Sequence, residues 1–279
     1  MADIEPRTEP KPDQKPSQSR GAHVVLEWER LAVRALGSTE THLTVRARHR
    51  VGPNYLRLQV DDGGLLARSA PYPTMWLRLW FDDAGQTHQR AFTVVEPDPS
   101  SGTFSLEFAL HDGAAADWAR QCQPGERIRA SLLGSKPPWE QKKSRRRSGS
   151  TSPAGLDADF TGRTVLIGDP AALPAVNAIL EAVPQTPVEV WLEHRTPEDR
   201  ELPVSAGEFH TVHWVHRSGD HDGIAAQLLD HWEQNSPGVE DRYWIAVEAA
   251  DTRQLNTALH TRYSVPRDHI CATAYWRAA

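Results

Sequence analysis

A length of 279 residues favours two domains, and a net charge of −6 excludes a general attraction to nucleic acid or to anionic membranes. The two cysteines, Cys122 and Cys271, are too few for a disulfide scaffold, and neither has a zinc-site neighbour at the usual spacing. No apolar run approaches the ~18 residues of a spanning helix, and the first residues lack the apolar core of a signal peptide. We therefore expect a soluble, cytoplasmic protein.

The first part of the chain predicts a tail followed by an antiparallel β-barrel. Residues 1–21 are rich in proline and charge and predict a disordered tail. From 22 to 135, apolar and polar residues alternate with a period of two, and turns interrupt the pattern. Strands are expected at 43–47, 55–60, 76–81, 92–95, 104–110 and 127–133, with a short helix at 114–121. About six strands at this spacing predict a closed or nearly closed barrel.

Residues 136–162 break this pattern and separate the two predicted domains. Pro137-Pro138 is followed by a basic run from Lys142 to Arg147. This composition predicts a mobile insertion. A solvated linker and a loop that binds an anion or a partner both remain open.

The last part of the chain, 163–279, alternates strands with helices. Strands are expected at 164–167, 188–192, 212–215, 243–247 and 270–276, and helices at 225–232 and 250–262. A further helix is expected after Gly168, with Asp169 as its N-cap and Pro170 at its first position. Pro174 recurs four residues on, so its first turn should be irregular. Strands separated by helices predict a parallel, doubly wound sheet, and the fold class is therefore β followed by α/β.

The stretch Arg90-Ala91-Phe92-Thr93 has the residue types that a flavin dinucleotide needs. Arg90 can hold a pyrophosphate, and Phe92 lies two residues on, so it shares a strand face with Arg90 and can pack on the ring. Thr93 can reach the reactive edge of the flavin. An ordinary edge strand with an exposed arginine and a core phenylalanine explains the same tetrapeptide, so the residues alone leave both interpretations open.

Two strand–helix junctions are further candidates for binding phosphate. His111 and Gly113 precede the helix at 114, whose first amides can bind a phosphate, and Trp118 lies within that helix. Gly168 and Asp169 follow the first parallel strand, where nucleotides bind in doubly wound sheets. A plain turn at the first junction and a capped helix at the second explain these residues equally well.

Five stretches of the chain occur in the order found in one known family. They are Gln89-Arg90-Ala91-Phe92-Thr93-Val94, Phe108 to Gly113 with Asp117-Trp118-Ala119, Pro124-Gly125-Glu126, Gly168-Asp169 with Ala172-Leu173-Pro174-Ala175, and Ala274-Tyr275-Trp276-Arg277. Over roughly 26–277 the sequence resembles the siderophore-interacting proteins, flavoproteins similar to ferredoxin–NADP reductases. The resemblance implies a flavin-binding barrel at 22–135 and an NAD(P)H-binding-like lobe at 163–279.

The resemblance also implies a function and a set of contacts. The expected activity is FAD-dependent reduction of a ferric siderophore, with electrons from NAD(P)H or a ferredoxin. The FAD contacts would be Arg90, Ala91, Phe92, Thr93, His111, Gly113, Trp118, Gly168 and Asp169. Basic groups that could hold the anionic siderophore are His194, Arg195 and Arg217. The flavin does the redox chemistry, so we expect no acid, base or nucleophile, and no protein metal site.

Four positions depart from the family pattern. Phe92 replaces a tyrosine, Thr74-Met75 replaces an Asp-His pair, and Gly134-Ser135 replaces Gly-Pro. Ala246-Val247-Glu248 replaces Ala-Gly-Glu, and the branched Val247 crowds the approach of a nicotinamide nucleotide. A divergent, non-catalytic member that binds a ligand or partner is therefore the alternative. A nucleic-acid binder is not favoured by one basic run on an acidic chain.

Overall fold

The computed structural model describes residues 39–83, 85–132, 135, 160–219 and 222–278, and the chain from Thr39 to Ala279 forms one compact unit. The predicted tail at 1–21, the stretch 22–38 and almost all of the predicted insertion lie outside these residues. Among the helices described, none has the length and apolar character needed to cross a membrane.

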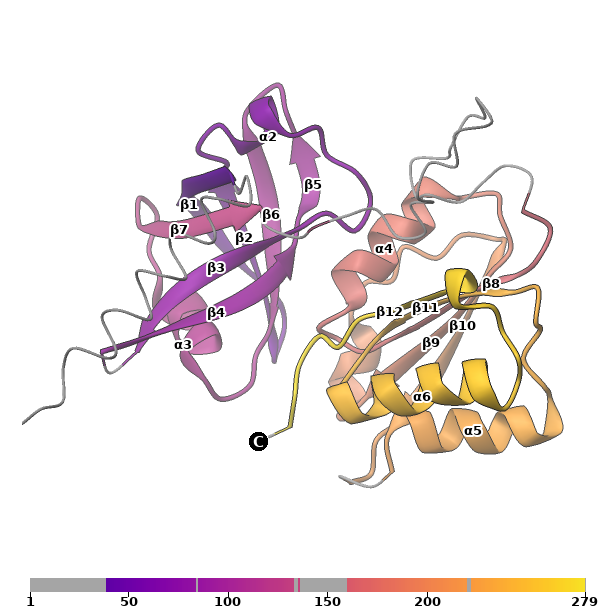
Figure 1. Cartoon of the computed structure of the whole chain (residues 1–279). Coiled ribbons are helices and arrows are strands. Elements are labelled where there is room, and N and C mark those ends of the chain that lie inside the picture. Colours follow the sequence, from indigo (N-terminus) through magenta and orange to yellow (C-terminus); the bar gives the residue numbers. More distant parts are fainter. Residues whose placement is uncertain (1–38, 84, 133–134, 136–159, 220–221, 279) are drawn as a thin grey trace, which may run out of the picture. The chain divides into compact units, whose positions relative to one another are not determined.

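The first half of the described chain is a seven-stranded antiparallel sheet in the order β4-β3-β7-β1-β2-β6-β5. Its strands are β1 (Thr39–Gly52), β2 (Tyr55–Asp61), β3 (Trp76–Asp83), β4 (Gln86–Thr93), β5 (Val95–Asp98), β6 (Thr103–Ala109) and β7 (Arg127–Leu132). Figure 1 shows this sheet curled into a half-barrel, with α3 (Ala114–Gln121) beside it. A short helix, α2 (Leu65–Arg68), was not predicted.

The barrel core follows from the period-two pattern of its strands. Leu77 and Leu79 of β3 are fully buried, as are Leu43 of β1 and Leu58 of β2, because alternate side chains of each strand turn to the concave face. The β3–β4 register sets Arg90 opposite Leu79 and Phe92 opposite Leu77. Arg90 and Phe92 therefore share the inner face, as predicted.

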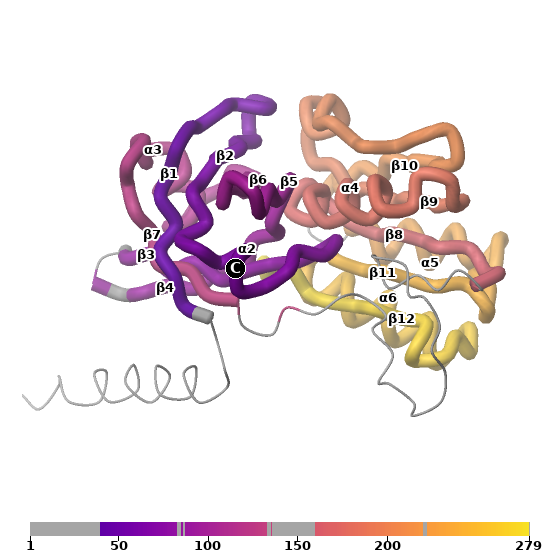
Figure 2. Tube along the Cα trace, turned by 90° about the horizontal axis from the view of Figure 1, so that it is seen from above, coloured from indigo at the N-terminus to yellow at the C-terminus, as the bar shows by residue number. Residues whose placement is uncertain are grey.

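The second half is a five-stranded parallel sheet in the order β10-β9-β8-β11-β12, which can be followed in Figure 2. Its strands are β8 (Thr164–Gly168), β9 (Val188–His194), β10 (His210–His216), β11 (Arg242–Ala246) and β12 (Ile270–Ala272). Its helices are α4 (Leu173–Ala182), α5 (Ile224–Gln234) and α6 (Ala249–Thr261), with single 3-10 turns at Pro197–Glu201 (η1) and Arg267–His269 (η2). The predicted parallel, doubly wound sheet is confirmed.

Helices cover both faces of this parallel sheet. Leu166, Val190 and Trp244 pack with α4 on one face, whereas the neighbouring residues Val165 and Ile245 pack with α5 and α6 on the other. Figure 1 shows α5 and α6 side by side, opposite α4. The strand order reverses between β8 and β11, and in such folds ligands bind outside the carboxyl ends of the strands at this point.

Three predicted strands differ from the structure by more than two residues. The strand expected at 43–47 extends from Thr39 to Gly52, and the other two differences have local causes. The strand expected at 92–95 is divided, because β4 pairs with β3 whereas β5 pairs with β6, and Glu96 takes a positive φ of 47°. The strand expected at 270–276 ends at Ala272. Beyond Ala272 the chain still runs beside β11. The Thr273 N–H donates to Ile245 O at 2.9 Å, and the Tyr275 N–H donates to Val247 O at 3.0 Å.

The helix after β8 begins later than predicted. It starts at Leu173 with Ala172 as its N-cap, rather than at Pro170 with Asp169 as the cap. Asp169 Oδ1 accepts the Ala171 and Ala172 amides at 2.9 and 3.1 Å, so it closes a separate turn before the helix. The predicted start of this helix, with Asp169 as its N-cap, is therefore wrong.

Candidate functional site

The predicted flavin strand, β4, is an edge strand of the barrel. Arg90 is exposed; its guanidinium donates to Gln89 O at 2.8 Å and has no carboxylate partner among the residues described. Ala91 is exposed as well, whereas Thr93 is 6% exposed. An edge strand keeps one row of backbone amides and carbonyls outside the sheet. A charged side chain and backbone groups are thus both accessible along β4.

An aromatic cluster connects β4 with α3. Phe92 packs on Phe108 with ring centroids 4.3 Å apart, and its ring also meets Phe81 edge-on at 6.0 Å. Trp118 of α3 contacts the same two rings, at 5.6 Å from Phe81 and 6.1 Å from Phe108. Edge-to-face and offset pairs of this kind hold their elements in place. The cluster therefore brings together two stretches that the sequence selected separately.

The start of α3 offers open backbone. Gly113, the N-cap, has a φ of 132°, which other residues rarely adopt, and no atom lies within 4 Å of the position a Cβ would take. His111 is exposed, and its Nδ1 lies 2.7 Å from Asp112 O. Asp117 stands in the first turn but is paired with Arg120 at 2.8 Å. No described side chain caps the first amides of α3, which is what an anion site at a helix start would require.

The carboxyl end of β8 is closely packed. A Cβ at Gly168 would lie 3.1 Å from Ala172 Cβ and 3.3 Å from Val176 Cγ2, so glycine permits the turn to fold against β8. Asp169 is 3% exposed. Besides the two turn amides, its carboxylate accepts the Trp276 Nε1–H through Oδ2 at 2.5 Å. Asp169 thereby ties β8 to the residues that follow β12.

Residues 275–278 lie at the reversal point of the strand order. Trp276 forms a parallel bridge with Glu248, and its carbonyl accepts the Ala249 amide at 2.9 Å. Glu248 caps α6 and also accepts the Ala278 amide at 3.3 Å. The chain's own backbone therefore uses the first amide of α6, a group that could otherwise bind a phosphate.

The burial of Asp169 changes its acidity. Burial is the main cause that raises the pKa of Asp169 from 3.8 to about 6; the hydrogen bond from Trp276 opposes this rise and the nearby charge of Glu193 adds to it. A folded-state pKa above the unfolded value means that the folded protein binds this proton more tightly. The stability that Asp169 contributes is therefore present below pH 4 and is lost as the pH rises through about 6.

We expect the free energy of unfolding to show this dependence when the protein is compared with Asp169→Asn, which cannot titrate. Relative to the variant, the protein should lose a total of about 3 kcal/mol between pH 4 and pH 7, from a pKa rise of about two units at 1.4 kcal/mol each. Urea unfolding of both proteins at several pH values measures this difference. A difference that does not change with pH would contradict the raised pKa.

Two predicted substrate contacts, His194 and Arg195, lie at the end of β9. Arg195 is exposed, and its guanidinium carbon is 5.1 Å from the centre of the Trp276 ring. His194 is half-buried, with its ring 5.0 Å from His216 and its Nδ1 3.2 Å from Thr196 O. Arg195 thus joins Asp169 and Trp276 in one group at the carboxyl edge of the sheet.

The third predicted substrate contact, Arg217, is buried instead of lying on the surface. Its side chain is 6% exposed and donates to Glu193 Oε1 at 2.7 Å and to the Asp251 carboxylate. Glu193 also accepts the Ile224 amide at 2.9 Å and so holds the start of α5. The substrate role of Arg217 stays a prediction, and its contacts favour a structural role.

The residues near β4 and those near β8 are connected through Tyr275. Its ring packs edge-on against Trp244 at 5.9 Å. Burial raises the pKa of Tyr275, against the opposing effect of a hydrogen bond with the Thr93 side chain. Thr93 ends the predicted flavin strand, and Tyr275 precedes the residue that binds Asp169. A second link is the Tyr55 hydroxyl, which donates to Pro170 O at 3.1 Å.

A curled antiparallel sheet followed by a doubly wound parallel lobe is the fold of ferredoxin reductase-like proteins. The model "Siderophore-interacting FAD-binding domain" matches residues 55–132, and the model "Siderophore-interacting protein" matches residues 161–279. The chain belongs to the siderophore-interacting protein family.

Individual proteins agree with this assignment. The mycobactin import ATP-binding/permease protein IrtA of Mycolicibacterium smegmatis is 32% identical over 88% of this chain, which spans only 26% of IrtA. The ferric vibriobactin reductase ViuB of Vibrio cholerae is 25% identical over 67% of the chain and 64% of ViuB. The structure of the siderophore-interacting protein SipS from Aeromonas hydrophila aligns with a TM-score of 0.66 and 21% identity, covering 86% of this chain and 92% of SipS.

Sequence reasoning did not list Tyr275 and Trp276 as site residues, although both lie in a motif that resembles the family. The resemblance of Ala274-Tyr275-Trp276-Arg277 to the family's motif was the sequence signal that could have identified both residues. Tyr55 and Glu107 form a buried pair, hydroxyl to carboxylate at 3.1 Å, and no sequence pattern pointed to it. Arg57 completes the pair with an ion pair to Glu107 at 2.6 Å.

Proposed function

We propose that this chain binds FAD and uses it to reduce a ferric siderophore, which releases ferrous iron. The observation that carries the proposal is the aromatic cluster that joins β4 to α3. In this cluster Phe92 of β4 and Trp118 of α3 pack on the same two phenylalanine rings. The strand that carries the exposed Arg90 and the helix that begins at Gly113 therefore share one packing contact. A cation and a set of helix amides are the groups that a dinucleotide pyrophosphate requires.

The described residues fit FAD in their chemistry. Arg90 would bind the pyrophosphate, the outer backbone groups of β4 would hydrogen-bond the ring, and Gly113 would let a phosphate approach α3. The Thr93 side chain lies beside Tyr275 and acts to lower the pKa of that phenol. We propose that its part in the site is to position the end of β4. When bound, FAD supplies the electrons.

The proposed siderophore contacts centre on Arg195. A ferric siderophore with catecholate ligands is anionic, and an exposed guanidinium beside an aromatic ring offers it charge and a flat surface. His194 lies next to Arg195 at the same strand end. Hard oxygen ligands hold Fe(III) more tightly than Fe(II), so a one-electron reduction weakens the complex.

The electron donor in this proposal is NAD(P)H or a ferredoxin. Trp276, bound to Asp169 and bridged to Glu248, lies where a nicotinamide nucleotide would dock in a doubly wound sheet. Val247 is buried at the same place. These contacts favour a donor that does not need this position, such as a ferredoxin. A cytoplasmic location, where both donors occur, is part of the proposal.

The function is tested by two measurements on one preparation. We expect the purified protein, after addition of FAD and desalting, to keep flavin absorption near 450 nm, a property of the cofactor. Anaerobic photoreduction of this flavin, followed by ferric mycobactin and a ferrous-iron chelator, should then yield coloured ferrous complex and reoxidised flavin. A protein that retains no flavin would favour the non-catalytic alternative. Retained flavin that is not oxidised by any ferric siderophore would confine the function to flavin binding.

A further inference from the structure

A pocket of about 300 Å³ lies at the amino end of the parallel sheet. It is lined by Arg163, which precedes β8, and by Glu189 and Tyr243, which are the second residues of β9 and β11. The group of Asp169, Arg195 and Trp276 follows the carboxyl ends of these parallel strands. The pocket is therefore at the opposite edge of the sheet from the proposed siderophore contacts.

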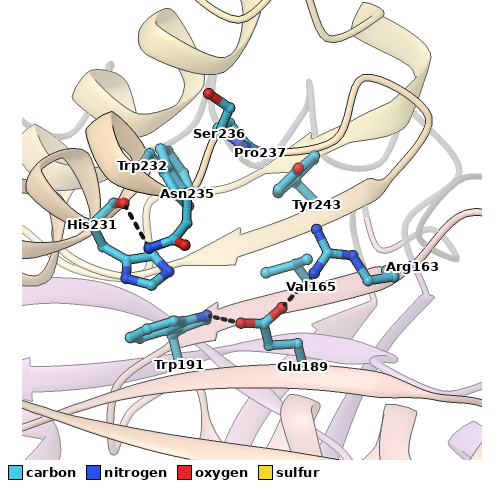
Figure 3. A pocket seen from close by; sticks show the side chains of 10 residues that line it. All are labelled: Arg163, Val165, Glu189, Trp191, His231, Trp232, Asn235, Ser236, Pro237 and Tyr243. Atoms are coloured by element: carbon cyan, nitrogen blue, oxygen red, sulfur yellow. Dashed lines mark hydrogen bonds and ion pairs between the residues drawn. The ribbon is translucent and has the colours of Figure 1, made fainter.

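Aromatic rings form much of this pocket. Trp191 of the sheet lines one side of the pocket, and Trp232 and His231, from the last turns of α5, line another (Figure 3). His213 of β10 stacks on Trp191 with centroids 4.3 Å apart, and His231 lies 5.0 Å from Trp191. Tyr243 is almost fully buried, and its hydroxyl donates to Gly238 O at 3.1 Å. The rings are thus held in place before any ligand enters.

The lining of the pocket carries one carboxylate, Glu189, and one guanidinium, Arg163. Arg163 is committed to Asp241, which accepts from its Nε at 3.1 Å and its Nη2 at 2.9 Å. Its Nη1 reaches Glu189 Oε2 only at 3.4 Å. Glu189 also accepts the Trp191 Nε1–H at 3.0 Å. Glu189 and Asp241 therefore share one guanidinium, which Asp241 holds more closely, and His213 Nε2 also lies 3.6 Å from Glu189 Oε1.

The end of α5 adds a negative potential to the pocket. The helix ends at Gln234, and the pocket is lined beyond it by Asn235 and Ser236. A helix C-terminus carries partial negative charge and stabilises cations. Aromatic faces attract cations as well, most strongly when Trp supplies the face. The carboxylate of Glu189, the C-terminal end of α5 and the indole rings all favour a positively charged ligand.

We propose that this pocket binds a small organic cation, an ammonium group with apolar substituents, with Glu189 as its counter-ion and Trp191 and Trp232 as its aromatic contacts. The volume of about 300 Å³ is at the lower end of the range for small-molecule sites, which suits a ligand of this size. The pocket is separate from the proposed flavin and siderophore contacts, and its test does not depend on them.

Choline is the probe, and 3,3-dimethylbutan-1-ol, which has the same shape without charge, is its matched control. By calorimetry on the full chain we expect choline to bind with a Kd of about 1 mM, and the neutral alcohol about tenfold more weakly. Glu189→Gln keeps the shape of the side chain and should weaken choline binding about tenfold. Glu198→Gln, which removes an exposed carboxylate beyond the other end of β9, should leave it unchanged.

Trp191→Leu is a second variant, because it retains Glu189 and removes one ring. It should also weaken choline binding, and circular dichroism of each variant establishes that it is folded. Equal affinities for choline and the alcohol, or a Glu189→Gln protein that binds choline as tightly as the original, would overturn the proposal. Absence of binding at about 20 mM choline, far above the expected Kd, would do so as well.

Discussion

Replacing Arg90 with alanine is expected to weaken FAD binding by about 10- to 100-fold, the usual loss when a charge-assisted hydrogen bond to a phosphate is removed. Arg90 is exposed on an edge strand, and its one side-chain hydrogen bond to the described residues is to the carbonyl of Gln89. Its removal should therefore change the free energy of unfolding by less than about 0.5 kcal/mol. Titration of the FAD-free protein with FAD, followed by flavin fluorescence, gives the two dissociation constants.

Arg127→Ala is the matched control for this change. Arg127 is also an exposed arginine on a strand of the same barrel, β7. The Arg127→Ala protein should bind FAD with the affinity of the original protein, because this substitution removes the same charge but leaves the proposed phosphate contact in place. Equal FAD affinity in the Arg90 and Arg127 variants would show that β4 is an ordinary edge strand, and the assignment of the flavin site would be wrong.

Replacing Arg217 with methionine is expected to lower the free energy of unfolding by about 3–5 kcal/mol, the cost of leaving buried charges without a partner. Glu193 and Asp251, whose side chains are 2% and 13% exposed, would both lose their cation. Glu193 also holds the first amide of α5, so this helix should loosen. Urea unfolding followed by circular dichroism measures the loss.

The comparison for this variant is Arg262→Met, which breaks an ion pair at the surface. Arg262 and Glu233 are 3.2 Å apart, and both side chains are about half exposed. Such pairs contribute about 0–1 kcal/mol, because water screens the charges. If the two variants lost the same stability, the buried position of Arg217 would be in error, and its predicted role as a surface contact for the siderophore would regain support.

Much of the fold could be predicted from the sequence, because periodicity records burial directly. The strand at 164–167 is a continuous apolar run, and in the structure it is covered on both faces by helices. The barrel strands alternate, and one face of each turns to the core. The helix at 114–121 was predicted with its observed boundaries. The boundaries at Val95 and Leu173 could not be predicted, since they depend on which strand β5 pairs with and on how Asp169 closes its turn.

For the candidate site, too, some features could be predicted from the sequence and others depended on the tertiary structure. Residue types and their order along the chain predicted the family and the fold class, and they selected the stretch from Arg90 to Thr93 as the candidate flavin site. Only the tertiary structure decided that Phe92 and Trp118 pack on the same two rings, that Arg217 is buried between two carboxylates, and that Trp276 donates to Asp169, 107 residues away. A sequence pattern reports which face of an element is apolar. Which distant side chains share a buried space, and how burial changes their charge, depends on packing between elements that lie far apart along the chain.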